Sequence, residues 1–244
     1  MIKRLSGDQL NEAKQIFSYH FNDITQRAAK AAREVGREPS EITLLAATKT
    51  VDPERINFAM GHGVPLMGEN RVQEFLEKAD ALAIGPERIH FIGHLQTNKV
   101  KYLIGRVSCI QSVDNLKLAG EIARLSSKAG ITTDVLAEIN IGSEKSKSGV
   151  EPENAEELVR EMAKLDGISV KGLMTIPPIC DKNDEISYFF ARMQKLFIDI
   201  RGKRIDNISM EILSMGMSGD FEEAIRHGAT MIRIGTALFG KRTY

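Results

Sequence analysis

The chain has 244 residues, 42% of them hydrophobic, and its 33 basic residues are balanced by 33 acidic ones. A net charge of zero provides no overall field for attracting nucleic acid or an anionic membrane, so neither is expected as a partner. Cys109 and Cys180 lie far apart and in no CxxC pattern, which argues against disulfides and a thiolate metal site. The N-terminus lacks an apolar signal-peptide core, and no stretch reaches the roughly 20 apolar residues of a membrane span. We therefore expect a cytoplasmic protein without a metal.

Apolar periodicity divides the chain into one long helix and a repeating strand–helix pattern. Helical spacing predicts an amphipathic helix over about residues 6–36. Eight short apolar runs follow, mostly without period-two alternation, and helical stretches separate them. The runs are residues 42–48, 64–68, 89–93, 108–113, 135–141, 170–176, 210–214 and 231–235. Continuous apolar strands are typical of parallel sheets that are buried on both faces.

Eight strands alternating with helices predict a (β/α)8 barrel, an α/β fold of the TIM type that commonly takes about 250 residues. We expect a single barrel domain over residues 1–244, since no linker or low-complexity segment interrupts the pattern. An open doubly wound sheet is the alternative, although no GxGxxG follows the first strand. The chain stops soon after the eighth strand, so the usual eighth helix is expected to be missing. The N-terminal helix is predicted to cover that gap.

Lys49 stands at the carboxyl end of the first predicted strand, the end at which barrels of this type carry their sites. Desolvation there would disfavour the ammonium form and make the amine a nucleophile. Schiff-base formation with a carbonyl is the natural chemistry of such a lysine. A solvated lysine after a strand is the alternative.

Two glycine-bearing turns follow the seventh and eighth predicted strands. The first contains Ser214, whose hydroxyl can bind an anion, and Gly216, which lets the backbone approach a ligand. The second contains Gly235 and Thr236. Loops after strands seven and eight frequently bind phosphate in this fold. Ordinary loop chemistry is the alternative for each turn.

A Schiff-base lysine facing a phosphate site suits pyridoxal 5′-phosphate (PLP), which carries an aldehyde and a phosphate. Arg233 lies two residues before Gly235 and points to the same side of its strand. Beside the pyridine nitrogen it would keep that nitrogen unprotonated, because a guanidinium only donates. A salt bridge inside the barrel is the alternative for Arg233. His94 could donate toward the ring or toward Lys49, or it could cap the helix that follows, and both alternatives stay open.

Six segments of the chain resemble the YggS/PROSC family of pyridoxal phosphate homeostasis proteins, and the match runs from about residue 9 to 242. The segments are AATK at 46–49, GENRVQE at 68–74, HFIGHLQTNK at 90–99, GLMT at 172–175, LSMGMSGD at 213–220 and RIGTALFG at 233–240. The resemblance implies the barrel of the alanine racemase N-terminal domain and PLP held as an internal aldimine on Lys49. It further implies phosphate contacts from Ser214, Gly216, Gly235 and Thr236, a pyridine-nitrogen contact from Arg233, and contacts to the ring or lysine from Asn70 and Met174.

By the same resemblance the protein acts in intracellular PLP homeostasis and transfer without robust catalysis. Its expected partners are PLP and apo PLP enzymes as acceptors, and we expect a monomer. A PLP-dependent amino-acid racemase-like enzyme is the alternative. Racemisation needs a second acid/base group, which alanine racemases of this fold supply from a tyrosine of a second domain. None of the four tyrosines is an obvious substitute. A regulator that signals PLP status to a partner is a third hypothesis.

Overall fold

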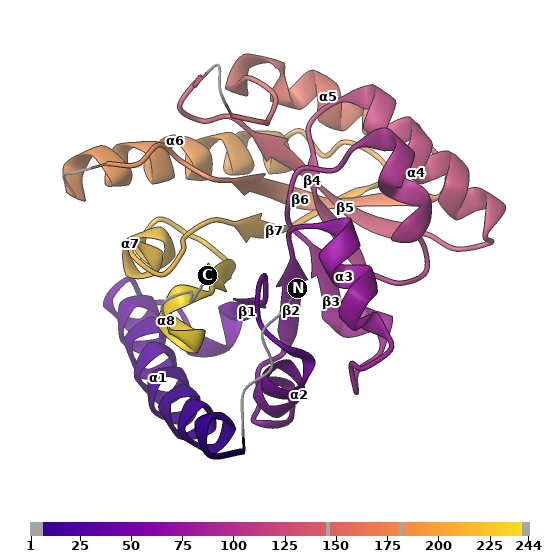
Figure 1. The fold of residues 1–244 in the computed structure, drawn as a ribbon. Helices are drawn as coiled ribbons and strands as arrows, with labels where there is room; N and C mark the ends of the chain where they lie inside the picture. Colours follow the sequence, from indigo (N-terminus) through magenta and orange to yellow (C-terminus); the bar gives the residue numbers. More distant parts are fainter. Residues whose placement is uncertain (1–6, 145–146, 181–182, 241–244) are drawn as a thin grey trace.

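Eight parallel strands close into a barrel in the computed structural model of the chain, which describes residues 7–144, 147–180 and 183–240. Each strand pairs with the next along the chain, and the last pairs with the first. The strands are β1 (Thr43–Ala47), β2 (Leu66–Glu69), β3 (Ile89–Phe91), β4 (Cys109–Val113), β5 (Thr133–Ile139), β6 (Ile168–Thr175), β7 (Ile208–Ser214) and β8 (Met231–Ile234). The predicted (β/α)8 barrel is confirmed, and the open sheet is excluded (Figure 1).

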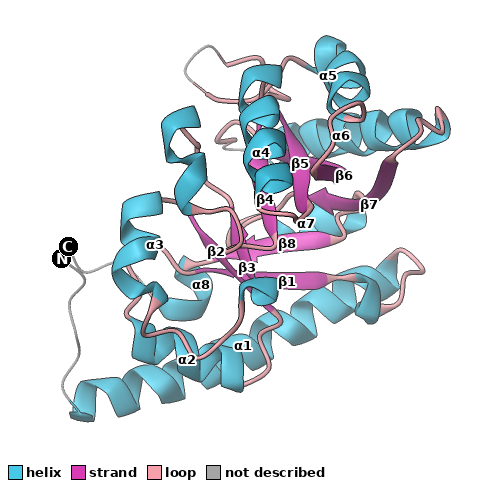
Figure 2. Cartoon of the chain, turned by 90° about the vertical axis from the view of Figure 1, so that its right-hand side faces the viewer, coloured by secondary structure: helices cyan, strands magenta, loops and turns pink. Residues whose placement is uncertain are grey.

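Helices cover the outside of the barrel, and Figure 2 shows them around the strands at its centre. The α-helices are α1 (Gly7–Glu34), α2 (Pro53–Gly61), α3 (Val72–Ala79), α4 (Leu116–Lys128), α5 (Ala155–Met162), α6 (Asn183–Gly202), α7 (Phe221–Arg226) and α8 (Thr236–Phe239). Short 3₁₀ turns are η1 (Pro39–Glu41), η2 (Pro86–Arg88), η3 (Thr97–Tyr102) and η4 (Pro152–Asn154). Across the described ranges no helix is long and apolar enough to cross a membrane.

Helix α1 lies across the side of the barrel where β8 returns to β1, next to α2, α7 and α8 (Figure 1). The Phe17 ring of α1 packs 5.4 Å from the Phe239 ring of α8. Arg27 binds Glu222 of α7 through two hydrogen bonds of 3.1 and 2.8 Å. The covering role predicted for the N-terminal helix is therefore confirmed. The prediction of a missing eighth helix is corrected to one short turn, because β8 leads directly into α8.

The barrel interior holds both apolar and polar side chains. Its apolar side chains form two clusters, one around Leu45, Ile92 and Met231, and one around Cys109, Leu136 and Met174. The larger core lies between the strands and the helices. Four buried polar side chains also reach the interior from neighbouring or facing strands: His90, Gln111, Ser214 and Arg233. Buried polar groups need hydrogen-bond partners, and these four form one network that runs from His90 through Gln111 and Ser214 to Arg233.

Candidate functional site

Lys49 follows the carboxyl end of β1 and is partly buried. It lies in a turn that the Val51 N–H closes by donating to the Thr48 carbonyl oxygen at 3.0 Å. The parallel register pairs Ala47 with Gly68, so the segments that carry Lys49 and Asn70 leave β1 and β2 at the same end of the barrel. The Asn70 Oδ1 atom is buried and has no hydrogen-bond partner in the described structure. A polar atom of this kind is available to a ligand.

A buried ion cluster holds the chain just before Lys49. The Lys78 side chain of α3 is fully buried, and its Nζ donates to the Thr48 carbonyl oxygen at 2.9 Å and to Glu69 Oε1 at 2.7 Å. The Thr48 hydroxyl donates to the same Glu69 oxygen at 2.5 Å. Burial raises the pKa of Glu69, and the charge of Lys78 opposes that shift. The cluster therefore ties β1, β2 and α3 together at the base of the lysine-bearing loop.

The same ion cluster also fixes the backbone of Thr50, the residue after Lys49. Glu74 Oε1 lies 3.0 Å from Lys78 Nζ and accepts a short hydrogen bond from the Thr50 backbone N–H. Thr50 has a φ of 65°, a left-handed conformation that a β-branched residue rarely adopts. Both neighbours of Lys49 are thus held by α3, so the backbone that carries the amine is fixed on both sides.

Arg233 is buried beneath the mouth, on β8. It donates through Nη1 to the Ser214 hydroxyl at 2.7 Å and through Nη2 to the Thr175 carbonyl oxygen at 2.8 Å. Burial lowers the pKa of Arg233 to about 10, while Asp220 and Glu138 act in the opposite direction. The guanidinium is therefore still charged at neutral pH. It is held by neutral acceptors, and the nearest carboxylates act at a distance rather than through a salt bridge.

Ser214 lies apart from the other residues that were expected to bind a phosphate. It is fully buried, accepts from Arg233 and donates to Gln111 Oε1 at 2.7 Å. Its register partner on β8 is Met231, which lies at the start of that strand. Both roles of the hydroxyl are thus taken up inside the barrel, where it supports the arginine.

The turns after β7 and β8 lie side by side, as predicted, but the Ser214 hydroxyl is not what joins them. The Gly216 carbonyl oxygen accepts from the Arg233 backbone N–H at 3.0 Å. Gly216 has a φ of 91°, and a Cβ there would lie 2.5 Å from the Ala224 Cβ, so only glycine fits. The Ser218 hydroxyl lies 3.2 Å from the Ala237 backbone nitrogen in the first turn of α8. Ser218 is therefore the hydroxyl beside Gly235 and Thr236, and sequence reasoning missed it.

Met174 and His94 lie at different depths. Met174 is fully buried in the barrel interior against Cys109 and Leu136. His94 is exposed, and its Nδ1 lies 3.2 Å from the Ser148 hydroxyl. The N-cap residue of η3 is Gln96, without a side-chain cap hydrogen bond, so the prediction that His94 caps this helix is wrong.

Glu138 is a second residue whose specific role the sequence did not reveal. It lies on β5, buried near the mouth, and its Oε2 has no partner among the residues the structure describes. Burial raises its pKa to about 7, Asp114 acts in the same direction, and Arg233 opposes both. In the sequence, Glu138 is only a polar residue between the apolar residues Ala137 and Ile139 of a strand. That pattern does not tell whether its carboxyl group lies at the mouth of the barrel or elsewhere.

Replacing Glu138 by glutamine is expected to change how stability depends on pH. The folded chain holds this proton more tightly than the unfolded chain, whose carboxyl has the ordinary pKa of 4.5. The stabilising contribution is therefore complete below about pH 4.5 and is lost as the pH rises through about 7. His90, with a pKa lowered to about 4 by burial, has the opposite dependence. The test is the difference in unfolding free energy between wild type and Glu138→Gln from pH 4 to 8. It should shift in favour of the variant as the pH rises, and a constant difference would contradict the assignment.

No group of three or more potential metal ligands occurs in the described ranges. The mouth instead combines a lysine amine, a buried cation and a turn of backbone N–H groups, which is a donor set for an anionic organic ligand. The fold and this mouth define a (β/α)8 barrel protein with a lysine-centred site.

The family model of the alanine racemase N-terminal domain matches residues 25–243. A pyridoxal phosphate homeostasis protein of Aquifex aeolicus is 47% identical over 221 residues, which cover 91% of this chain and 96% of the relative. The crystal structure of an unknown protein from Bifidobacterium adolescentis superposes with a TM-score of 0.90 at 36% identity, over 98% and 99% of the two chains. PipY of Synechococcus elongatus with PLP bound superposes with a TM-score of 0.74 at 28% identity, over 89% and 100%. The chain belongs to the family of pyridoxal phosphate homeostasis proteins.

Proposed function

We propose that the chain binds PLP at the carboxyl end of the barrel and holds it as a Schiff base on Lys49. The observation that carries the proposal is the convergence at one mouth of Lys49, Arg233 and the turn at Gly235. β8 pairs with β1, so a Cβ on Gly235 would lie only 3.3 Å from the Ala47 carbonyl oxygen. The phosphate turn and the lysine strand are therefore neighbours. The PLP bound to the similar PipY structure supports the same ligand.

Each group at the mouth has a role that its chemistry suggests. The backbone N–H groups around Gly235 and Thr236, with the Ser218 hydroxyl, suit a phosphate. The Arg233 guanidinium is an obligatory donor and suits the unprotonated pyridine nitrogen. The Oδ1 atom of Asn70 is buried without a partner in the described structure and is an acceptor for the ligand or for the amine. When bound, PLP supplies an electrophilic aldehyde to which the Lys49 amine can bond.

We further propose that the protein stores and transfers PLP rather than racemising amino acids. A racemase needs an acid/base group on each face of the substrate Cα. The tyrosines in the described part of the chain lie on the outer helices: Tyr19 on α1, Tyr102 on η3 and Tyr188 on α6, all exposed. All three are therefore surface residues rather than residues of the barrel interior. The homeostasis names of the relatives support the same role, with apo PLP enzymes as the acceptors.

Two assays separate carriage from catalysis. In the first, PLP-loaded protein is mixed with an apo PLP enzyme, and recovery of that enzyme's activity is followed beside an equal amount of free PLP. We expect recovery. In the second, the loaded protein is incubated with L-alanine in D2O, and deuterium at Cα is measured. We expect no exchange beyond that of free PLP, and faster exchange would favour the racemase-like alternative.

Paired substitutions of the two serines test the phosphate assignment. Ser218→Ala is expected to weaken PLP affinity about tenfold to a hundredfold with little loss of stability, because a hydrogen bond to a charged group is worth about 1.5–3 kcal/mol. Ser214→Ala is expected to lower the unfolding free energy by about 1–3 kcal/mol even without PLP, because it leaves Arg233 and Gln111 without a buried partner. PLP titration and denaturant unfolding of both apo variants measure this. A larger loss of PLP affinity in Ser214→Ala than in Ser218→Ala would assign the phosphate contact to Ser214 instead.

A further inference from the structure

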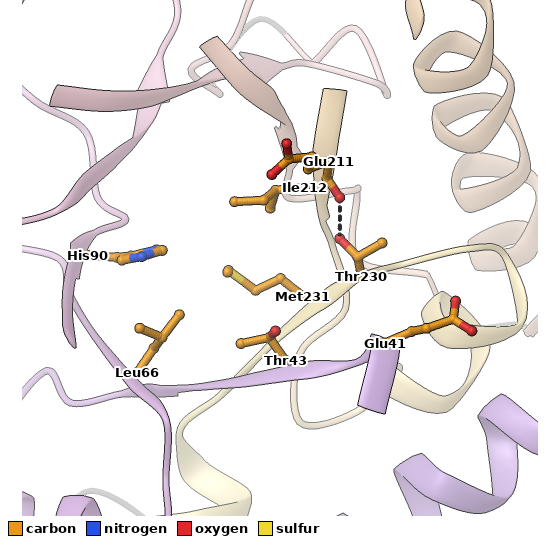
Figure 3. Close-up of a pocket in the computed structure, with 8 residues that line it drawn as sticks. All are labelled: Glu41, Thr43, Leu66, His90, Glu211, Ile212, Thr230 and Met231. Carbon is orange, nitrogen blue, oxygen red and sulfur yellow. Dashed lines mark hydrogen bonds between the residues drawn. The ribbon is translucent and has the colours of Figure 1, made fainter. Parts of the chain in front are cut away.

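A cavity of about 470 Å³ opens at the amino end of the barrel, opposite the Lys49 mouth. Thr43, Leu66 and Met231 begin β1, β2 and β8, so they mark this end. The eight lining residues are Glu41, Thr43, Leu66, His90, Glu211, Ile212, Thr230 and Met231. Figure 3 shows the His90 ring pointing across the cavity toward Met231 and Ile212. A space of this size can hold a small organic molecule.

The hydrogen-bond network of the barrel fixes where the His90 proton sits. Arg233 can only donate, so the Ser214 hydroxyl accepts from it and donates its own hydrogen bond to Gln111 Oε1. The Gln111 amide nitrogen then lies 2.8 Å from His90 Nδ1 and 3.1 Å from the Met231 sulfur. Nδ1 must therefore accept, and the ring proton of neutral His90 is on Nε2.

This proton is left as a hydrogen-bond donor for a ligand. His90 is only 5% exposed, and within the described residues Gln111 is the one hydrogen-bond partner of its ring. Because the cavity opens to solvent, water can accept from Nε2, and a ligand acceptor that replaces this water gains the net value of one hydrogen bond, about 1 kcal/mol. Burial lowers the pKa of His90 to about 4, so the ring stays neutral and keeps this tautomer at physiological pH.

The rest of the lining limits the chemistry of the ligand. Leu66, Ile212 and Met231 supply apolar walls. The exposed carboxylates of Glu41 and Glu211 stand at the rim, and Arg37 offsets only that of Glu41, at 3.1 Å. The charge of Lys171 acts on Asp134, whose carboxylate also lies within reach of the charge of Glu211. An anion would have to pass these carboxylates and lose its water against apolar side chains, which is costly.

We propose that the amino-end cavity is a second binding site, for a small uncharged molecule with an apolar body and one hydrogen-bond acceptor placed against His90 Nε2. The site is separate from the Lys49 mouth and does not depend on what that mouth binds. The ligand acceptor would add one member to the series of hydrogen bonds that runs from His90 through Gln111 and Ser214 to Arg233. Its binding therefore polarises the hydrogen bonds of Arg233, which lies below the Lys49 mouth.

Three probes that share one ring test this site: benzamide, toluene and benzoate. Each is titrated into the apo protein while the imidazole resonances of the five histidines are followed by ¹⁵N NMR. We expect benzamide to move the His90 Nε2 resonance saturably, with a dissociation constant of about 1–10 mM for so small a ligand. Toluene lacks the acceptor, and benzoate adds a charge, so each should bind at least about fivefold more weakly.

The other histidines are internal controls. His62 packs among aromatic rings at the end of α2 and should not respond. His94 lies beyond β3 toward the Lys49 mouth, so its movement in place of His90 would put the probe at the other end of the barrel. Three results would overturn the proposal: no saturable His90 shift, equal affinity for benzoate, or a response confined to His94. Benzamide should also shift the Met231 methyl resonance of the wild-type protein, and His90→Phe should abolish that shift. If the variant does not fold, the wild-type titration alone tests the proposal.

Discussion

Lys78→Met is expected to lower the free energy of unfolding by about 3–5 kcal/mol, the usual cost of removing one partner from a buried ion pair. Lys78 has no solvent exposure, and Glu69, its partner at 2.7 Å, is equally buried. Without the ammonium, Glu69 must stay charged in an apolar setting or take up a proton. The Thr48 carbonyl oxygen also loses its side-chain donor. The substitution therefore leaves a fully buried carboxyl group without its counter-charge.

Denaturant unfolding of the apo protein measures this loss. Lys195→Met is the matched control, because Lys195 pairs with Asp199 on the surface of α6 at 2.5 Å with 75% of its side chain exposed. The control should cost less than about 1 kcal/mol. Adding Glu69→Gln to Lys78→Met should restore part of the loss. Equal effects of the two lysine substitutions would show that the cluster contributes no more than a surface pair.

Lys49→Ala is expected to abolish the visible absorbance of the PLP Schiff base while leaving the fold intact. Lys49 lies at the rim of the barrel, and its neighbours Thr48 and Thr50 are each held by α3. The melting temperature of the apo variant should therefore remain close to that of wild type. The absorbance spectrum with added PLP and circular dichroism together measure both parts of this expectation.

Lys147→Ala is the matched control for the loss of absorbance. Lys147 is another lysine near the carboxyl end, and its Nζ donates to the Pro177 carbonyl oxygen at 2.9 Å and pairs with Glu144 at 2.7 Å. Its removal should leave the band in place. A band that persists in Lys49→Ala and disappears in Lys147→Ala would move the Schiff base to the other lysine.

The barrel could be predicted because its strands are short apolar runs at regular spacing, and the position of Lys49 followed directly from the first of them. Local signals also succeeded where one residue decides the geometry. Asp52 accepts from the Arg55 backbone N–H at 3.0 Å and begins α2, as a helix start before Pro53 suggests. For the helix that begins at Leu116 the sequence predicts Asp114 as the cap, and this prediction is wrong because the neighbouring Asn115 offers the same chemistry. The structure selects Asn115, which accepts from the Leu118 N–H at 2.9 Å.

The supporting residues could not be predicted because their partners are distant in the sequence. Lys78 lies in a charged helix and resembles any surface lysine, until the fold brings Thr48 and Glu69 against it. Ser214 and Ser218 share one turn, and spacing alone does not tell which of them faces the barrel interior. His90 had no evident partner, whereas the closed sheet places Gln111 of the next strand beside it. In each case the missing information was three-dimensional contact.

Borohydride reduction of the PLP-loaded protein, followed by peptide mapping, tests the central proposal most directly. Reduction should convert the visible band into a stable adduct on the single peptide that contains Lys49. A band that maps to another lysine would remove Lys49 from its role. A protein that stays colourless and takes up no added PLP would contradict the cofactor assignment itself.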